Sequence, residues 1–158
     1  MKLSLAESID LLDVEKLYKS VIGTPYCVWN EEYPTIFEIE EDYKSNCLYV
    51  LKEDTKVIGA VSVNHLDEMS ELNNWTKTLK HCEIARVVIN KDYQNKHIGY
   101  LMIKQLLSIL KEVGYLSVRL AVEINHLPAI KLYEKCGFNK VGNHYMYGHD
   151  YYLYEYLM

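Results

Sequence analysis

Apolar residues recur at helical spacing in two long segments of the chain. Residues 98–113 carry the clearer pattern, and Gly114 follows them as a residue suited to the position after a helix. The apolar positions of that segment are Ile98, Leu101, Met102, Leu106, Ile109, Leu110 and Val113. Residues 8–21 carry a second pattern at Ile9, Leu12, Leu17 and Val21, with Ser8 as the expected N-cap. We predict an amphipathic helix in each segment.

Two shorter segments are also predicted to be helical. The Gly-Thr-Pro sequence at 23–25 ends the first helix, and Pro34 opens an acid-rich helix over residues 34–44. A further short helix is expected from about residue 126 to residue 136, with Asn125 as its N-cap and Gly137 after its end.

The remaining apolar runs are short and indicate strands. The predicted strands are 3–5, 47–52, 56–64, 83–89, 116–122, 138–147 and 151–157. Residues 53–55 form a tight turn, whereas residues 65–80 are polar and form a loop long enough to be functional. The resulting order, β-α-α-β-β-β-α-β-α-β-β, predicts an α/β fold with a mixed sheet and helices on its faces. Without an internal repeat or a linker, residues 1–158 are expected to form a single domain.

The composition describes an ordinary soluble domain. Of 158 residues, 49% are hydrophobic and 25% are charged, and no apolar run approaches the ~18 residues of a membrane span. Glu7 interrupts the N-terminal segment, so a secretory signal is not expected. The four cysteines lack C-x-x-C spacing or clustering with histidine. We therefore expect reduced thiols, a cytoplasmic location, no metal and no membrane association.

Charge is distributed unevenly along the chain. The net charge is −5, which disfavours nucleic acid as a partner. Residues 1–79 carry 7 lysines and 15 acidic residues, whereas residues 80–158 carry 10 basic and 7 acidic residues. One half could favour a cationic ligand and the other an anionic ligand. Uneven surface decoration explains the same counts equally well.

One strand-loop-helix segment has the features of a phosphate site. In V-V-I-N-K-D-Y-Q-N-K-H-I-G, residues 87–99, a strand leads through a polar loop directly into the long helix. Unpaired N–H groups at a helix N-terminus suit phosphate. Gln94, Asn95 and Lys96 would add donors, and Gly99 would let a ligand approach the backbone. Many such loops bind nothing, so this segment is ambiguous by itself.

A second segment removes that ambiguity. The sequence N-H-L-P-A-I-K-L-Y-E-K-C-G-F, from Asn125 to Phe138, contains an asparagine before a short helix and Tyr133 within it. Each residue alone is more often structural, as a cap or a core aromatic. Together with the first segment, however, this sequence resembles the GNAT superfamily of N-acetyltransferases. The resemblance is specific over about residues 81–142, and the order of elements agrees over the whole chain.

The resemblance implies a GNAT-like domain, with a mostly antiparallel sheet, about four helices and acetyl-CoA as co-substrate. Backbone contacts to the pantetheine arm would come from Val87, Val88 and Ile89. The pyrophosphate would contact Gln94, Asn95, Lys96, His97, Ile98, Gly99 and Tyr100. Asn125 would bond the cofactor, and Tyr133 would lie beside its sulfur. His97 departs from the family's usual glycine and Tyr100 from a usual small residue, so the imidazole either crowds the pyrophosphate or donates to it.

The same resemblance suggests the catalytic groups. Glu83 lies four residues before Val87 and is the candidate general base, because an amine attacks only as the neutral form. Strand alternation would place Glu83 and Val87 on one face, unless a bulge shifts it. Val88 N–H is the expected oxyanion donor, and Tyr133 the acid for the leaving thiolate. Alternatively, Glu83 is a structural residue paired with Arg86 or a lysine, and Glu123 is the next candidate base.

The acceptor is expected to be a small, cationic primary amine. Trp29, Glu32 and Tyr33 are the candidate acceptor residues, since acids and aromatics suit a cation. Residues 38–42 are interpreted instead as a solvated acidic helix face. The six tyrosines after residue 144 could line the groove, cover a homodimer contact or fill strand faces. A non-catalytic acyl-CoA-binding or regulatory module with the same fold is the alternative function.

Overall fold

The computed structural model describes residues 1–64 and 68–158, which form a seven-stranded sheet in the order β1-β2-β3-β4-β5-β7-β6. The strands are β1 (Lys2–Leu5), β2 (Leu48–Glu53), β3 (Lys56–Asn64), β4 (His81–Ile89), β5 (Ser117–Glu123), β6 (Asn139–Met146) and β7 (His149–Leu157). Neighbouring strands are antiparallel except β4 and β5, which are parallel. The expected order of elements and the mixed, mostly antiparallel sheet are confirmed.

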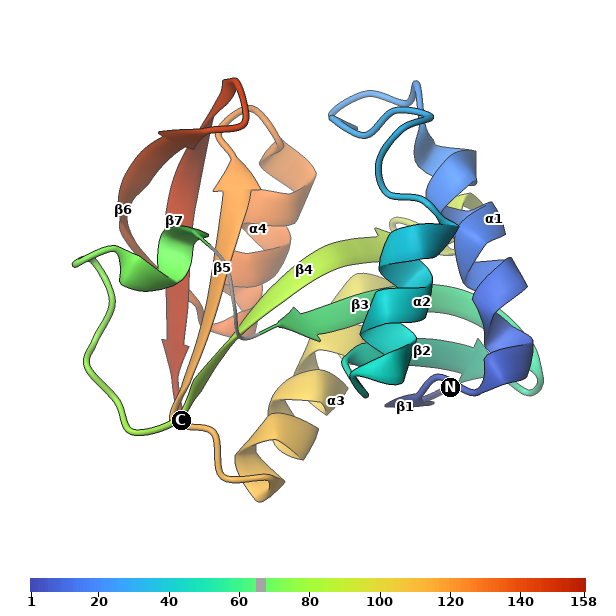
Figure 1. Ribbon diagram of the computed structural model, residues 1–158, viewed down its shortest axis with the longest axis horizontal. Helices are drawn as coiled ribbons and strands as arrows, with labels where there is room; N and C mark the ends of the chain where they lie inside the picture. The colour runs from blue at the N-terminus through green and yellow to red at the C-terminus, as the bar shows by residue number, and fades with distance from the viewer. Residues whose placement is uncertain (65–67) are drawn as a thin grey trace.

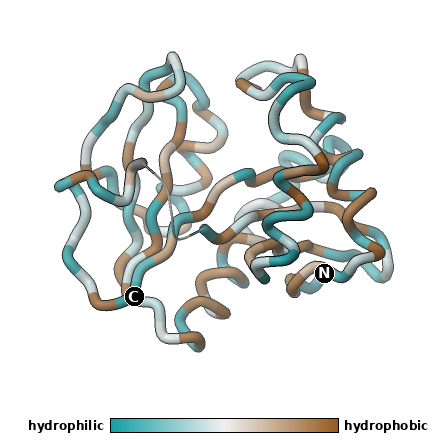
Figure 2. Tube along the Cα trace, viewed as in Figure 1, coloured by the Kyte–Doolittle hydropathy of each residue, from teal (hydrophilic) through white to brown (hydrophobic). Residues whose placement is uncertain are grey.

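Helices cover both faces of the sheet (Figure 1). They are α1 (Leu11–Val21), α2 (Ile36–Lys44), α3 (Ile98–Glu112) and α4 (Leu127–Cys136), with short 3₁₀ helices η1 (Ser8–Asp10), η2 (Glu68–Glu71) and η3 (Lys91–Tyr93). One apolar core lies between the sheet and α3 and α4, and a second between the sheet and α1 and α2. Figure 2 shows α3 as one of the most hydrophobic segments, which agrees with the burial of its inner side.

A loop covers the part of the second face that α1 and α2 leave open. Met69 and Trp75 are buried against Met146 of β6 and Leu153 of β7. The Trp75 Nε1–H group donates to the Met69 carbonyl at 2.6 Å, and this hydrogen bond links the two ends of the segment from residue 69 to residue 75. Residues 69–75 are therefore packed as a layer over β5, β7 and β6.

The first helix differs from the sequence prediction in its start and its buried face. A 3₁₀ turn precedes α1, and its N-cap is Glu7 rather than Ser8. The Asp10 carboxylate accepts the Glu7 N–H at 2.9 Å. Ile9 and Leu12 are 80% and 64% exposed, although both were predicted to face the core. The later start rotates the buried stripe, which consists of Val14, Leu17, Tyr18 and Val21.

The prediction for α3 needs a smaller correction, and that for α4 a change of cap. Leu101 and Val113 are exposed, whereas Ile103 and Leu107 are buried in their place. At α4 the cap is His126, whose Nδ1 accepts the Ala129 N–H at 3.3 Å. Asn125 lies one residue before this N-cap position. Its side-chain amide and its own N–H group bond instead to the Glu123 carboxylate. No helix of the described chain is long and apolar enough to cross a membrane.

Candidate active site

The sheet opens between its two parallel strands. β4 and β5 pair with each other only through residues 81–83 and 117–119. Beyond these residues β4 continues to Ile89 and β5 to Glu123 without pairing to each other. Figure 1 shows the two strands diverging from this point. The backbone edge of β4 that follows Glu83 therefore faces a wedge-shaped gap, to which other chemical groups could hydrogen-bond.

A bulge in β4 determines which side chains face which layer. Ala60 lies opposite Val88 but Ser62 lies opposite Ala85, so β4 contains one extra residue, and Arg86 there has a φ of 49°. Val87 and Ile89 pack toward α3, whereas Val88 packs toward α1 and α2. Glu83 and Val87 therefore lie on opposite faces, because the bulge that the sequence analysis allowed for is present and its extra residue reverses the alternation.

The direction of the backbone N–H groups in β4 changes which residue can serve as the oxyanion donor. The Asn90 N–H donates to the Ile58 carbonyl at 2.8 Å. Because paired and unpaired positions alternate, Val88 turns its N–H toward β3, whereas Ile89 turns its own into the gap. The Gln94 Nε2–H group donates to the Ile89 carbonyl at 3.1 Å, which confirms that direction. Ile89, not Val88, thus presents an N–H group to the gap.

The loop between β4 and α3 uses left-handed backbone at two positions. Asn95 and His97 have φ values of 58° and 61°, and His97 precedes the first residue of α3. This conformation explains why a glycine suits position 97. The His97 Nδ1 atom lies 3.1 Å from Lys135 Nζ, which adds a positive charge beside the helix N-terminus. Lys96 Nζ donates to the Asp92 carbonyl within the loop.

The packing of two helices explains why residue 99 is a glycine. A Cβ atom at Gly99 would lie 3.2 Å from Leu132 Cδ2 of α4. Glycine therefore allows close approach of α3 and α4. Tyr100, the next residue, lies under the Lys135 ammonium at 5.1 Å from the ring centre.

Glu83 is buried at the point where β4 and β5 separate. It is 1% exposed, and its Oε1 atom accepts a hydrogen bond from Ser70 Oγ at 2.6 Å. Arg86 does not pair with it, since that guanidinium bonds to Asp42 and Tyr33. The proposed structural pairing of Glu83 with Arg86 is thus wrong. Burial raises the pKa of the adjacent Cys82 thiol to about 12, so Cys82 stays protonated and is no nucleophile.

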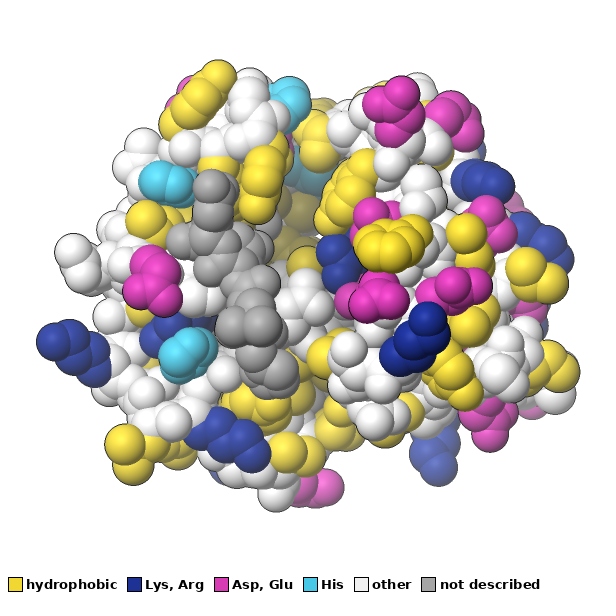
Figure 3. Space-filling model, viewed as in Figure 1, with side chains coloured by type: hydrophobic (Ala, Val, Ile, Leu, Met, Phe, Trp, Pro, Cys, Tyr) yellow, Lys and Arg dark blue, Asp and Glu magenta, His cyan; other side chains and the backbone are white. Residues whose placement is uncertain are grey.

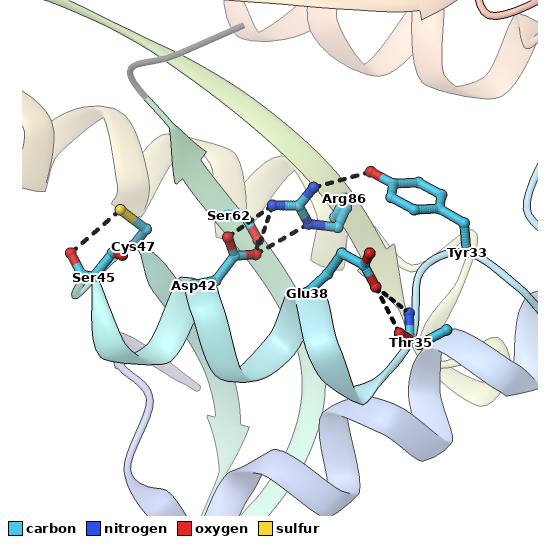
Figure 4. Close-up of polar contacts among 8 residues, drawn as sticks. All are labelled: Tyr33, Thr35, Glu38, Asp42, Ser45, Cys47, Ser62 and Arg86. Carbon is cyan, nitrogen blue, oxygen red and sulfur yellow. Dashed lines mark hydrogen bonds and ion pairs between the residues drawn. The ribbon is translucent and has the colours of Figure 1, made fainter.

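Arg86 of β4 is joined to α2 and to the segment before α2 (Figure 4). Its Nη2 group lies 2.8 and 2.7 Å from the two Asp42 carboxylate oxygens, and its Nη1 group donates to the Tyr33 hydroxyl at 2.9 Å. Ser62 Oγ donates to the same Asp42 carboxylate at 2.6 Å. Burial acts to lower the pKa of Arg86, but Tyr33 and Asp42 raise it above its ordinary value. The guanidinium is therefore permanently charged and fixed.

The acidic helix is only partly the solvated face that the sequence suggested. Glu40 and Glu41 are exposed, but Asp42 is buried through its ion pair with Arg86. Glu38 caps α2, accepting the Thr35 N–H at 2.7 Å. Of the three candidate acceptor residues, Tyr33 contacts Arg86 and is 44% exposed, Trp29 packs edge-on against Tyr18, and Glu32 is exposed.

Tyr133 approaches from the opposite face of the sheet. It lies on α4 within the core beneath α3 and α4, with its ring 5.8 Å from that of Phe138. Burial raises its pKa above the ordinary value, so the hydroxyl is protonated at neutral pH. A protonated hydroxyl can donate to a developing anion. Glu83 and Tyr133 therefore lie on the two faces of a sheet that is open between them.

The C-terminal tyrosines have several roles. The Tyr154 hydroxyl donates to Glu134 at 2.8 Å, and Tyr156 packs against Phe138, so both fill the core side. Tyr145 and Tyr147 are exposed at the hairpin of β6 and β7.

Figure 3 shows the surface hollowed between the part over α1 and α2 and the part over β5, β7 and β6. The described residues contain no group of three histidine, cysteine or acidic side chains that could hold a metal.

Comparisons with known proteins agree with this architecture. Residues 14–138 match the model of the Acetyltransferase (GNAT) family. The chain is 28% identical over 150 residues to an N-alpha-acetyltransferase of Sulfurisphaera tokodaii, over 90% of this chain and 86% of that protein. A ribosomal-protein-alanine N-acetyltransferase from Brucella melitensis has a TM-score of 0.77 at 15% identity, over 100% of both chains. A Salmonella typhimurium protein solved with acetyl-CoA has a TM-score of 0.75 at 16% identity, over 99% and 93% of the chains.

The chain therefore belongs to the Acetyltransferase (GNAT) family. It is an N-acetyltransferase, an acyltransferase whose acyl donor is acetyl-CoA.

Several residues of the site escaped sequence reasoning. Ser70 lies in a polar loop without a motif, and Asp42 was grouped with its exposed neighbours. Arg86 and Arg119 each carry a charge within an apolar strand, and Arg119 is buried beside Glu155. A charged residue in a buried strand indicates an oppositely charged partner elsewhere in the fold. The two arginines were therefore the sequence feature that could have indicated these buried ion pairs.

Proposed function

We propose that this protein acetylates a primary amine by direct transfer, with Glu83 as general base and Tyr133 as general acid. The observation that carries the proposal is the gap between β4 and β5, with Glu83 at its start and Tyr133 on the opposite layer. A thioester in that gap would be reached by an amine from one face and by the acid from the other.

The residues around the gap fit acetyl-CoA, which supplies the thioester. The open edge of β4 over Val87, Val88 and Ile89 offers backbone groups for the pantetheine amides, most directly at Ile89. Residues 94–97 lead into the N-terminus of α3, a 15-residue helix that begins at Ile98, where N–H groups favour phosphate, and Lys135 adds charge there. Asn125 lies at the start of α4, within the motif that carries the cofactor contact in the family.

The need for proton transfer follows from the chemistry of the amine and of the leaving thiol. A free alkyl amine has a pKa of about 10, so the attacking amine must lose a proton during the reaction. Glu83 would accept it, and a positioned base contributes roughly 10²–10⁴-fold. Tyr133 would protonate the departing sulfur. Its contribution should be smaller, because a thiolate with a pKa of about 8.5 leaves readily.

A small, cationic amine is the acceptor that we propose. Tyr33 is 44% exposed, and the acidic residues of the first half of the chain give that half a net negative charge. Asp42 does not add to this attraction, since Arg86 neutralises it. The α-amine of a peptide is a second candidate, favoured by the identity to the Sulfurisphaera tokodaii N-alpha-acetyltransferase.

Release of the CoA thiol in the presence of polyamines, amino-acid amides and short peptides tests both candidates. Turnover that depends on a polyamine supports the first, and turnover that depends on a free peptide N-terminus supports the second. Glu83→Gln should lower kcat/KM for the amine by about 10²-fold or more, with CoA affinity nearly unchanged. Tyr133→Phe should cost less, and Glu41→Gln, at an exposed position of α2, is the control. Near-wild-type turnover by Glu83→Gln would make Glu83 structural and Glu123 the next candidate.

A further inference from the structure

A buried ionic network fastens residues 75 and 76 onto β5 and β7. Arg119 of β5 and Glu155 of β7 are both buried, and Arg119 Nε lies 3.6 Å from Glu155 Oε2. Arg119 Nη2 donates to the Thr76 carbonyl at 2.9 Å, and the Thr76 hydroxyl donates to Glu155 Oε1 at 2.6 Å. Ser117 Oγ donates to Glu155 Oε2 at 3.0 Å. Residue 76 is thereby fixed at both its carbonyl and its side chain.

The network is extended to η2 through Trp75. The Arg119 guanidinium carbon lies 5.3 Å from the centre of the Trp75 ring, which is a cation–π contact. The indole N–H in turn donates to the Met69 carbonyl at 2.6 Å. Ser70 follows Met69 directly, so its backbone is held by an anchor that reaches into the sheet.

Ser70 is thus placed against the candidate base. Its hydroxyl lies 2.6 Å from Glu83 Oε1, a distance typical of a hydroxyl that donates to a carboxylate. Glu83 is 1% exposed, whereas Ser70 is half-buried and so the more accessible of the two. A hydroxyl has a single proton, and Ser70 gives it to Glu83. A hydroxyl oxygen that donates its proton keeps two lone pairs, so it is chemically able to accept a hydrogen bond from an amine N–H group.

We propose that Ser70 is a further catalytic residue, which relays the proton of the attacking amine to Glu83. The proposal rests on the proposed function, in which Glu83 is the base. As the new N–C bond forms, the amine N–H bond breaks and its proton moves to Ser70 Oγ. The original hydroxyl proton moves to Glu83 Oε1 in the same step. The C–S electron pair leaves with the sulfur, Ser70 ends unchanged, and Glu83 releases its proton to solvent.

Substitution of the hydroxyl tests the relay. Ser70→Ala should lower kcat/KM for the amine about 10- to 100-fold, with KM for acetyl-CoA unchanged. Ser70→Thr keeps the hydroxyl and should recover most of the activity. Ser20→Ala is the matched control, because Ser20 donates only to the Leu17 carbonyl on α1. Wild-type activity of Ser70→Ala would overturn the relay.

A double variant separates the relay from an independent effect. If Ser70 and Glu83 act as one unit, Ser70→Ala should cost nothing further in the Glu83→Gln background. An equal loss in both backgrounds would overturn the relay and make Ser70 a binding residue. Full activity of Glu83→Gln alone would instead overturn the assignment of the base, and the relay with it. If Ser70→Ala and Glu83→Gln are each slow and the double variant is no slower than Glu83→Gln alone, the results support both the relay and the assignment of Glu83 as the base.

Solvent isotope effects provide a readout that a structural role would not change. The wild-type rate should depend on the deuterium fraction along a curve, because two protons move together. The residual rate of Ser70→Ala should depend on it linearly, since one proton then moves. A linear dependence in both proteins would contradict the relay even if Ser70→Ala were slow or less stable.

Discussion

Arg86 and Asp42 form a two-pronged ion pair that connects the bulge of β4 to α2. Three contacts of 2.7 to 3.0 Å link the guanidinium to the carboxylate, and both side chains are largely buried. The left-handed backbone at Arg86 is unfavourable for a residue with a Cβ atom. The ion pair and the bond to Tyr33 offset that cost. The bulge of β4, the segment around Tyr33 and α2 are therefore stabilised as one unit.

Removal of one partner of this pair should destabilise the fold. Asp42→Ala leaves the buried Arg86 charge without its carboxylate, and we expect the free energy of unfolding to fall by about 3 kcal/mol. Denaturant unfolding measures this change. Glu40→Ala on the same helix is the control, because an exposed side chain should change stability by no more than about 0.5 kcal/mol. Equal stability of the two variants would show that the ion pair is dispensable.

Glycine at position 97 should stabilise the protein and affect cofactor binding. His97→Gly removes the strain of a left-handed residue, and we expect a gain of about 1 kcal/mol in the free energy of unfolding. If the imidazole crowds the pyrophosphate, CoA should also bind more tightly in a calorimetric titration. Asn95→Gly, which is also left-handed, is the control for the backbone effect. Weaker CoA binding by His97→Gly would show instead that the imidazole donates to the phosphates.

The cap of α4 should make stability depend on pH. Burial lowers the pKa of His126, although its backbone contact and the charge of Glu123 act in the other direction, and Tyr26 stacks on its ring. The unfolded histidine titrates near pH 6.5, so below that pH the unfolded state binds more protons. Stability should therefore fall as the pH decreases from 7 toward 5.

His126→Asn tests this dependence, because asparagine is also a good N-cap but does not titrate. The variant should lose less stability than the wild type between pH 7 and pH 5, as measured by denaturant unfolding at each pH. His149→Asn, at an exposed position of β7, should keep the wild-type dependence. An identical pH dependence in His126→Asn and the wild type would exclude His126 as the group responsible.

The sequence by itself determined the order of helices and strands, because apolar periodicity depends on local backbone geometry. The segment at 98–113 alternates apolar and polar residues at the period of a helix, and α3 occupies nearly the same range. The motif from Asn125 to Phe138 likewise indicated the family before any contact was known. It did not indicate that His126 rather than Asn125 caps α4, since both residues can accept the required hydrogen bond.

Only the tertiary structure decided how the site is assembled. The bulge at Arg86 reverses the faces of β4, and no local pattern marks it, because it depends on the register with β3. Asp42 resembles Glu40 and Glu41 in sequence, yet the approach of Arg86 buries it. Ser70 reaches Glu83 because Trp75 and Arg119 fix a loop that is polar and aperiodic. Local sequence thus specified the elements, whereas contacts between residues distant along the chain specified the chemistry.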